Sequence, residues 1–212
     1  MRRPIPEWLR YSLPHRAFCA LRDHWTVRVW RRRGGQGEAP HAIKRAAVLN
    51  YARAHDLHVL VETGTFRGEM LFACRHHFDA LFSIELEPNL AAAAQKRFAR
   101  WQKVNVLQGD SATVLPAVLE KLKHRALFWL DAHYCGPAAG RGETDTPIIE
   151  ELRLILAHPI PNHVILIDDA RCFGAHEGYP TVEECIKFVM DRRPKWTSEV
   201  RDDILRFEPP RP

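Results

Sequence analysis

The sequence predicts an α/β fold with a mostly parallel sheet. From residue 41 onwards, short apolar segments of strand length alternate with helical patterns, joined mainly by connections of two to five residues. This alternation is typical of βαβ units. The strand segments are almost continuously apolar, as expected when helices cover both faces of a sheet.

The length of 212 residues fits one domain with a short appendage. With 46% hydrophobic and 27% charged residues, the composition is that of an ordinary globular protein and excludes a disordered, collagen-like or coiled-coil chain. No apolar run approaches the ~20 residues that span a bilayer. We expect a basic arm and linker over residues 1–37 and an α/β domain over 38–212.

The N-terminal arm concentrates positive charge. Residues 1–33 hold nine Arg and only two acidic residues, a net charge of +7, so the remaining chain has about −2. The body is therefore not a nucleic-acid-binding surface by charge. Apolar side chains such as Trp8, Phe18 and Trp25 lie among the arginines, which favours packing on the domain or on a second subunit in a homodimer. Contact with an anionic membrane surface is the alternative.

Signals for export are missing from the sequence. The N-terminus has neither an apolar stretch of signal-peptide length nor a small-residue cleavage site. The five cysteines are scattered and include no CxxC pair, which indicates reduced thiols. We expect a cytoplasmic protein, with peripheral membrane contact through the arm as the alternative.

The elements follow in order from residue 41. Ile43, Ala47 and Ala54 stand at helical spacing. The predicted helices cover 41–54, 69–77, 88–101, 112–123, 147–157 and 181–192. The predicted strands cover 58–62, 80–85, 105–108, 126–131 and 163–168, followed by a hairpin of 196–200 and 204–207. A longer segment, 132–146, follows the fourth strand at the sheet edge where open α/β sheets bind ligands.

Acidic residues and glycines follow the first two strands. Glu62 ends the first strand, and Gly64 and Gly68 permit a tight strand-to-helix turn that brings the backbone close to a ligand. The GxGxxG dinucleotide motif is absent. Glu85 ends the second strand, where an acid suits ribose hydroxyls. An acidic cradle without a phosphate motif fits a cationic nucleoside better than a nucleotide.

These motifs make residues 41–208 resemble the class I S-adenosylmethionine-dependent methyltransferases. The first turn is similar to motif I, Ser83-Ile84-Glu85-Leu86 to motif II, and Gly109-Asp110-Ser111 to the turn that contacts adenine. The resemblance implies a Rossmann-like, seven-stranded, mostly parallel sheet in the order 3-2-1-4-5-7-6, with helices on both faces and S-adenosylmethionine as cofactor. The cofactor-binding residues it implies are Glu62, Thr63, Gly64, Thr65, Gly68, Glu85, Leu86, Gly109, Asp110, Ser111 and Asp131.

Three more carboxylates follow the fourth and fifth strands. Asp131 ends one, and Asp168 and Asp169 end the other, so on adjacent strands they converge at one rim. Near them in the sequence the only cation is Arg171, which cannot neutralise three repelling carboxylates. A hard divalent cation resolves the repulsion, and oxygen ligands suit Mg²⁺, with Ca²⁺ or Mn²⁺ as alternatives. We therefore expect a metal site at Asp131, Asp168 and Asp169.

The same region is similar to metal-dependent O-methyltransferases of the catechol and caffeoyl-coenzyme A type. In them an Asp after strand four joins an Asp-Asn pair after strand five, whereas this chain has Asp-Asp, as in sugar-modifying members. The resemblance implies that the metal acidifies and aligns the acceptor hydroxyl, with Asp131 in the catalytic group. Where those enzymes place a Lys, this chain has Tyr134, preceded by His133. His133 is the candidate general base, because its pKa lies near neutrality; a metal ligand or a loop hydrogen-bonding role remains open.

The sequence thus predicts a divalent-metal-dependent O-methyltransferase. A further resemblance, to small bacterial methyltransferases associated with surface-glycan or secondary-metabolite genes, implies a sugar, sugar nucleotide or similar polar acceptor. Arg141, Glu143 and Arg171 are candidate acceptor contacts, although solvated roles suit them equally. A metal-dependent hydroxylase or hydrolase on the same scaffold, and a non-catalytic cofactor-binding module, are the alternative functions.

Overall fold

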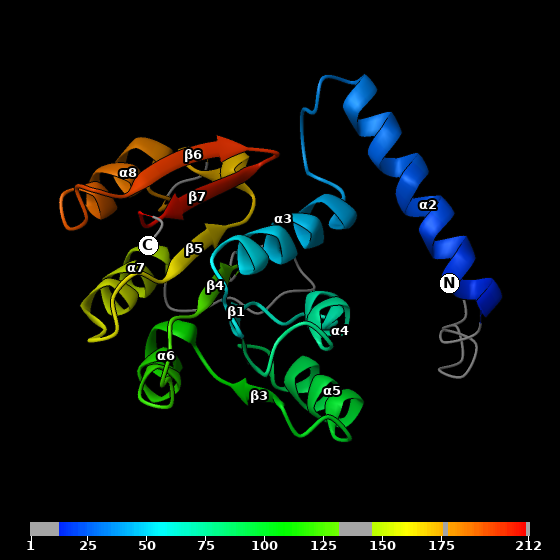
Figure 1. Ribbon diagram of the computed structural model, residues 1–212, viewed down its shortest axis with the longest axis horizontal. Coiled ribbons are helices and arrows are strands. Elements are labelled where there is room, and N and C mark those ends of the chain that lie inside the picture. The colour runs from blue at the N-terminus through cyan, green and yellow to red at the C-terminus, as the bar shows by residue number, and fades with distance from the viewer. Residues whose placement is uncertain (1–12, 132–145, 176–177, 211–212) are drawn as a thin grey trace.

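The computed structural model describes residues 13–131, 146–175 and 178–210. They form a sheet covered by helices, with α2 (Leu13–Arg32) extending away from it as an arm (Figure 1). No helix among the described residues combines the length and apolar character needed to cross a membrane.

The sheet confirms the predicted topology. Its strands are β1 (Val59–Thr63), β2 (Ala80–Glu85), β3 (Val104–Gln108), β4 (Leu127–Leu130), β5 (Val164–Ile167), β6 (Thr197–Arg201) and β7 (Ile204–Glu208). The order is 3-2-1-4-5-7-6. Strands β1 to β5 are parallel to their neighbours, and β7 is antiparallel to both β5 and β6. The carboxyl ends of β1, β4 and β5 therefore meet at one edge.

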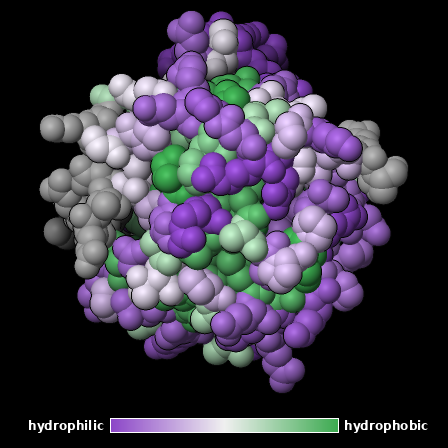
Figure 2. Space-filling view, turned by 90° about the vertical axis from the view of Figure 1, so that its left-hand side faces the viewer, coloured by the Kyte–Doolittle hydropathy of each residue, from purple (hydrophilic) through white to green (hydrophobic). Residues whose placement is uncertain are grey.

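Helices cover both faces of this sheet. They are α3 (His41–Ala54), α4 (Glu69–Cys74), α5 (Pro88–Phe98), α6 (Ser111–Leu119), α7 (Ile148–Ala157) and α8 (Val182–Met190), with a 3₁₀ turn, η1, at Ala170–Cys172. Alternate residues of β4 belong to different cores: Phe128 and Leu130 pack with α6, α7 and α8, whereas Leu127 and Trp129 pack with α3, α4 and α5. Two-sided burial explains why the strands read as continuous apolar runs. Apolar patches lie among mostly hydrophilic side chains on the α7 and α8 side (Figure 2).

Four predicted helices are two to four residues too long at their C-terminal ends. In the structure they end at Cys74, Phe98, Leu119 and Met190. Beyond three of these ends the N–H groups of His77, Trp101 and Leu122 donate to carbonyls three residues back, at 2.8, 2.8 and 3.0 Å. Such 3₁₀-type turns satisfy terminal carbonyls without continuing the α-helix.

At the edge of the sheet where β4 and β5 begin, a chain of hydrogen bonds joins the sheet to the ends of α6 and α7. The N–H of Ala126 donates to His163 Nδ1 at 3.0 Å, so His163 Nε2 carries the proton that it donates to His158 Nδ1, also at 3.0 Å. His158 Nε2 then donates to the carbonyl of Leu119 at 3.1 Å. Burial, with His158 adding to the effect, lowers the pKa of His163 to about 4, so the His163 ring is neutral in this arrangement.

The described side chains of α2 touch the domain between Asp23 and Trp30, and Asp23 pairs with Arg45 of α3 at 3.5 Å. Trp30 and Val27 pack against Ala39 and Ile43. Leu21 and Trp25 are 71% and 64% exposed. For this part of α2, the packing of the arm on the domain or on a second subunit stays a prediction, as does the boundary at residue 37.

Candidate active site

Hydrogen bonds between strands bring the three predicted carboxylates together. Beyond the last paired residues of β4 and β5, the N–H of Asp131 donates to the carbonyl of Thr63 at 2.9 Å, and that of Asp168 donates to Leu130 at 3.0 Å. Ligand oxygens of Asp131, Asp168 and Asp169 lie within 4.8 Å of one another. The predicted convergence at one rim is thus confirmed.

A left-handed turn places Asp169 beside Asp168. Asp169 has φ = 52°, and its N–H donates to Asp168 Oδ1 at 2.8 Å. A non-glycine residue in this region costs of order 1 kcal/mol or more and persists where the surroundings hold it. Here the following turn, η1, is held by the N–H of Ala170, which donates to the carbonyl of Asp203 at 2.9 Å.

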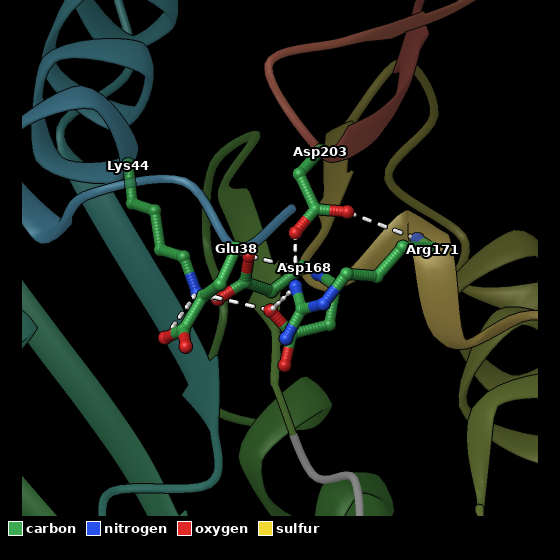
Figure 3. A network of polar contacts seen from close by, with 6 residues as sticks. Glu38, Lys44, Asp168, Arg171 and Asp203 are labelled. Atoms are coloured by element: carbon green, nitrogen blue, oxygen red, sulfur yellow. Dashed lines mark hydrogen bonds and ion pairs between the residues drawn. The ribbon is translucent and has the colours of Figure 1, made fainter. Parts of the chain in front are cut away.

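A lysine distant in sequence completes this group. Lys44 Nζ, from α3, lies 2.6 Å from Asp168 Oδ2 and 3.1 Å from Asp169 Oδ1 (Figure 3). Arg171 pairs with Asp169 at 2.8 Å and also with Asp203. The expectation that Arg171 is the only cation at the rim is therefore wrong, because folding brings in α3 from 125 residues away.

Burial and mutual repulsion change the acidity of the rim. Burial raises the pKa of Asp168 to about 7, although Lys44 lowers it. Burial and the neighbouring Asp168 raise the pKa of Asp131. The pKa of Asp169 is lowered, because the attraction of Lys44 and Arg171 outweighs its burial. Asp168 and Asp169, together, raise the pKa of Lys44 in spite of its burial, so this side chain is an ammonium ion.

The first strand contributes another buried acid, Glu62. Glu62 is 2% exposed and accepts a hydrogen bond from Ser83 Oγ, which in turn contacts Thr65 Oγ1. Burial raises the pKa of Glu62 to about 8, with Glu85 adding to the rise and the Ser83 hydrogen bond opposing it. Glu62 therefore holds a proton near neutral pH when nothing is bound beside it.

Glu85 closes the turn that follows β1. Its carboxylate accepts from the N–H of Phe66 at 2.6 Å and from that of Glu87 at 2.9 Å. Each oxygen keeps a further lone pair for another donor. The predicted ribose-binding acid thus also positions the backbone of the turn.

The two predicted glycines of this turn have left-handed conformations. Gly64 has φ = 87° and Gly68 has φ = 67°. A Cβ on Gly68 would lie 2.6 Å from Cε2 of Phe98, in α5. At Gly68 the backbone lies close to the Phe98 ring, and the close approach of this turn to a ligand stays a prediction.

The third predicted motif lies at the start of α6. Asp110 caps this helix, since its side chain accepts from the N–H of Ala112 at 2.9 Å. Gly109 precedes it with φ = 142°, and a Cβ there would lie 2.7 Å from Val114. Ser111 is buried, and Leu86 follows β2 at the same edge of the sheet.

One cavity joins the turn after β1 to the acidic rim. Its volume is about 240 Å³, and its lining includes Glu62, Gly64 and Thr65 on one side and Lys44, Asp131 and Asp168 on the other. Candidate cofactor residues and candidate metal ligands thus face the same space. His133, Tyr134, Arg141 and Glu143 lie outside the described residues.

Sequence reasoning missed one buried acid of this region, Glu151 on α7. It is fully buried, and burial raises its pKa to about 7 while the hydroxyls of Ser111 and Thr63 lower it. A signal was present, because Glu151 stands on the same helical stripe as Ile148, Leu152 and Ile155, which are all buried.

Comparisons with known proteins show the fold. No family model and no curated protein matches the sequence. The O-methyltransferase TomG from Streptomyces achromogenes, involved in tomaymycin synthesis and solved with S-adenosylmethionine, is 18% identical with a TM-score of 0.61, over 98% of this chain and all of TomG. An O-methyltransferase from Bacillus cereus, solved with S-adenosylhomocysteine, is 13% identical with a TM-score of 0.59, over 87% of this chain and 88% of its own.

A third match is the methyltransferase PaMTH1 from Podospora anserina, solved with S-adenosylhomocysteine. It is 16% identical with a TM-score of 0.55, over 99% of both chains. The chain therefore has the fold of S-adenosylmethionine-dependent methyltransferases, as the motifs predicted.

The packing of Gly68 against Phe98 gives a stability test. We expect Gly68→Ala to lower the free energy of unfolding in urea by about 2–4 kcal/mol, from a left-handed alanine together with an overpacked ring. Gly37→Ala is the matched control, because Gly37 has φ = 77° and open space around its Cβ position; it should cost only about 1 kcal/mol. Phe98→Leu in the Gly68→Ala background should recover part of the loss. Equal losses at Gly68 and Gly37 would contradict the steric explanation.

Proposed function

We propose that this protein is an S-adenosylmethionine-dependent O-methyltransferase that methylates a hydroxyl of a small polar acceptor, such as a sugar or sugar nucleotide. The observation that carries the proposal is the shared cavity, in which the turn after β1 faces the carboxylates after β4 and β5. The solved O-methyltransferases of the same fold support it.

In this proposal the acids at the strand ends bind the cofactor. Glu85 accepts from the ribose hydroxyls through the lone pairs that Phe66 and Glu87 leave open. Asp110 and Ser111 face the adenine from the start of α6. Glu62 and Asp131 give the cavity an acidic lining that suits a sulfonium cation. Thr63, Gly64, Thr65, Gly68 and Leu86 remain predicted parts of this cofactor site.

The acidic rim fits a divalent cation. Its three carboxylates offer oxygen donors within 4.8 Å of one another, the ligand type that Mg²⁺ prefers. Within the part of the chain that the structure describes, five carboxylates surround Lys44 and Arg171, namely those of Glu38, Asp131, Asp168, Asp169 and Asp203. Five acids against two cations leave a formal charge of about −3 when all five are ionised. When bound, the ion would supply Lewis acidity that lowers the pKa of the acceptor hydroxyl.

Methyl transfer forms a bond between the acceptor oxygen and the methyl carbon as the bond from that carbon to sulfur breaks, leaving S-adenosylhomocysteine. The hydroxyl proton must leave to a base, and His133 is our candidate because an imidazole titrates near neutral pH. The cavity's role is to hold oxygen, carbon and sulfur in line, which lowers the entropic part of the barrier.

Cofactor identity is tested by calorimetry. We expect the wild-type chain to bind S-adenosylmethionine, and Glu85→Ala to weaken binding by about 1.5–3 kcal/mol, the range for a hydrogen bond to a charged group. Glu87→Ala is the control, since Glu87 caps α5 by accepting from the N–H of Leu90 and lies two residues from Glu85; it should keep the wild-type affinity. Binding of NAD in place of S-adenosylmethionine would refute the proposal. Turnover of an acceptor without consumption of S-adenosylmethionine would favour the hydroxylase or hydrolase alternative.

Metal dependence has its own test. Mg²⁺ should raise the melting temperature of chelator-treated protein, because it binds only the folded state. Asp168→Asn with Asp169→Asn should abolish this rise and reduce methyl transfer far more than S-adenosylmethionine affinity. Asp191→Asn, an exposed change on the far end of α8, is the control and should behave as wild type. Full activity of chelator-treated protein, or of the double variant, would refute a metal mechanism.

For the arm we propose contact with a second copy of the chain. Leu21 and Trp25 are exposed apolar side chains, and the arm's +7 complements the body's charge of about −2. A homodimer would bury these side chains against the oppositely charged body. The location that we propose for the protein remains the cytoplasm.

Removal of the exposed apolar pair tests this arrangement. Leu21→Ser with Trp25→Ser should shift the protein from dimer to monomer in light scattering, while S-adenosylmethionine binding persists. Arg22→Ser, on the same helix, is the control for loss of one exposed side chain and should remain dimeric. A wild-type monomer that binds anionic liposomes in a salt-sensitive way would point to the membrane alternative and overturn the homodimer.

A further inference from the structure

Lys44 occupies the position among the rim carboxylates where a cation is needed. Its ammonium nitrogen lies 2.6 Å from Asp168 Oδ2 and 3.1 Å from Asp169 Oδ1, with the two aspartates 0% and 4% exposed. The Lys44 side chain itself is only 10% exposed. This is a closed ion pair within the cavity rather than a mobile surface contact.

A divalent ion at the rim needs the same oxygens. Mg²⁺ lies about 2.1 Å and Ca²⁺ about 2.3–2.6 Å from its carboxylate oxygens. An ion at such distances from Asp168 Oδ2 would lie within about 5 Å of an ammonium that is 2.6 Å from the same atom. Like charges at this separation repel strongly in a partly buried site. The lysine and the metal would therefore compete for these oxygens.

A second acid lies on the outer side of the lysine. Glu38 Oε1 is 3.8 Å from Lys44 Nζ, and the Glu38 side chain is 69% exposed (Figure 3). Lysine has a flexible four-carbon stem and three rotatable donors. A short movement of the ammonium toward Glu38 would keep it paired and would free Asp168 Oδ2, while Asp169 Oδ1 would still be paired with Arg171 at 2.8 Å.

We propose that Lys44 is a tethered counter-cation that competes with the divalent ion for Asp168 and Asp169, and that it pairs with Glu38 when the ion binds. The inference rests on the metal site of the proposed function. It gives Lys44 two opposite effects: it stabilises the metal-free fold by compensating buried carboxylates, and it weakens metal binding. A lysine with a purely structural role would have the first effect only.

Metal affinity measured directly separates these roles. In Mn²⁺ titrations of the chelator-treated full chain followed by electron paramagnetic resonance, Lys44→Met should bind Mn²⁺ at least tenfold more tightly than wild type. Its melting temperature without metal should be lower. Lys44→Arg keeps the charge and should stay within about threefold of wild type, as should Arg45→Met, whose side chain pairs with Asp23 outside the rim.

Glu38→Gln provides a second variant that leaves the buried pair in place. Without its outer partner the displaced lysine is left unpaired, so Mn²⁺ binding should weaken by about threefold or more while metal-free stability stays unchanged. This exposed substitution also covers the case in which Lys44→Met fails to fold.

The outcomes distinguish this inference from the function on which it rests. Measurable Mn²⁺ binding by wild type with equal or weaker binding by Lys44→Met would overturn the competition and leave the metal site standing. Unchanged binding by Glu38→Gln would overturn the transfer of the lysine to that residue. Failure of every variant to bind Mn²⁺ would overturn the metal site itself, and the competition with it.

Discussion

The parallel hydrogen-bond ladder extends one residue past the ends of β4 and β5, and the chemistry of this molecule depends on that extension. Asp131 and Asp168 are each held by a backbone bond to the neighbouring strand, at 2.9 and 3.0 Å. The backbone thus holds the two residues side by side at the ends of neighbouring strands. Buried acids so close together need cations from elsewhere. The positions of Lys44 on α3 and Arg171 on η1 follow from this need, as does the predicted affinity of the rim for a metal.

Helix α3 links the rim to the arm. Ile43, which packs against Trp30 of the arm, precedes Lys44, which pairs with Asp168. Successive residues on a helix point about 100° apart, so one turn of α3 faces both α2 and the carboxylates. A partner that engages the arm would thus act on the helix that carries the rim's lysine. This gives a physical route between the proposed association of two chains and the proposed site, through packed side chains rather than through a flexible link.

The local sequence pattern predicted much of this arrangement. It did not predict contacts between residues that lie far apart in the sequence. Because both faces of the sheet are buried, β4 and β5 are continuous apolar runs that the sequence identifies as strands. Parallel strands end at one edge of a sheet, so the meeting of Asp131 with Asp168 could be predicted from the sequence. The contact of Lys44 with the rim could not be predicted, because nothing in the amphipathic pattern of 41–54 shows that this helix lies beside the carboxylates. Gly68 was recognised as a turn residue, but its contact with Phe98 depends on how α5 packs. Glu151 was visible as an acid on an apolar stripe and was overlooked.

The neutral ring of His163 and the buried glutamates make the stability of the fold depend on pH in opposite directions. His163 resists protonation down to about pH 4 in the native protein, whereas an unfolded histidine takes up a proton near 6.5, so acidification favours unfolding. Glu62 and Glu151 hold their protons up to about pH 8 and 7 in the native protein, whereas unfolded glutamates ionise near 4.5, so their contribution to stability declines as the pH rises from about 4.5. Through these groups, proton linkage lowers stability toward acid at His163 and toward alkali at the two glutamates. Because the pKa of Asp168 is about 7, the rim ionises further as the pH rises, so it attracts cations more strongly under the conditions in which Glu62 and Glu151 contribute less to the stability of the fold.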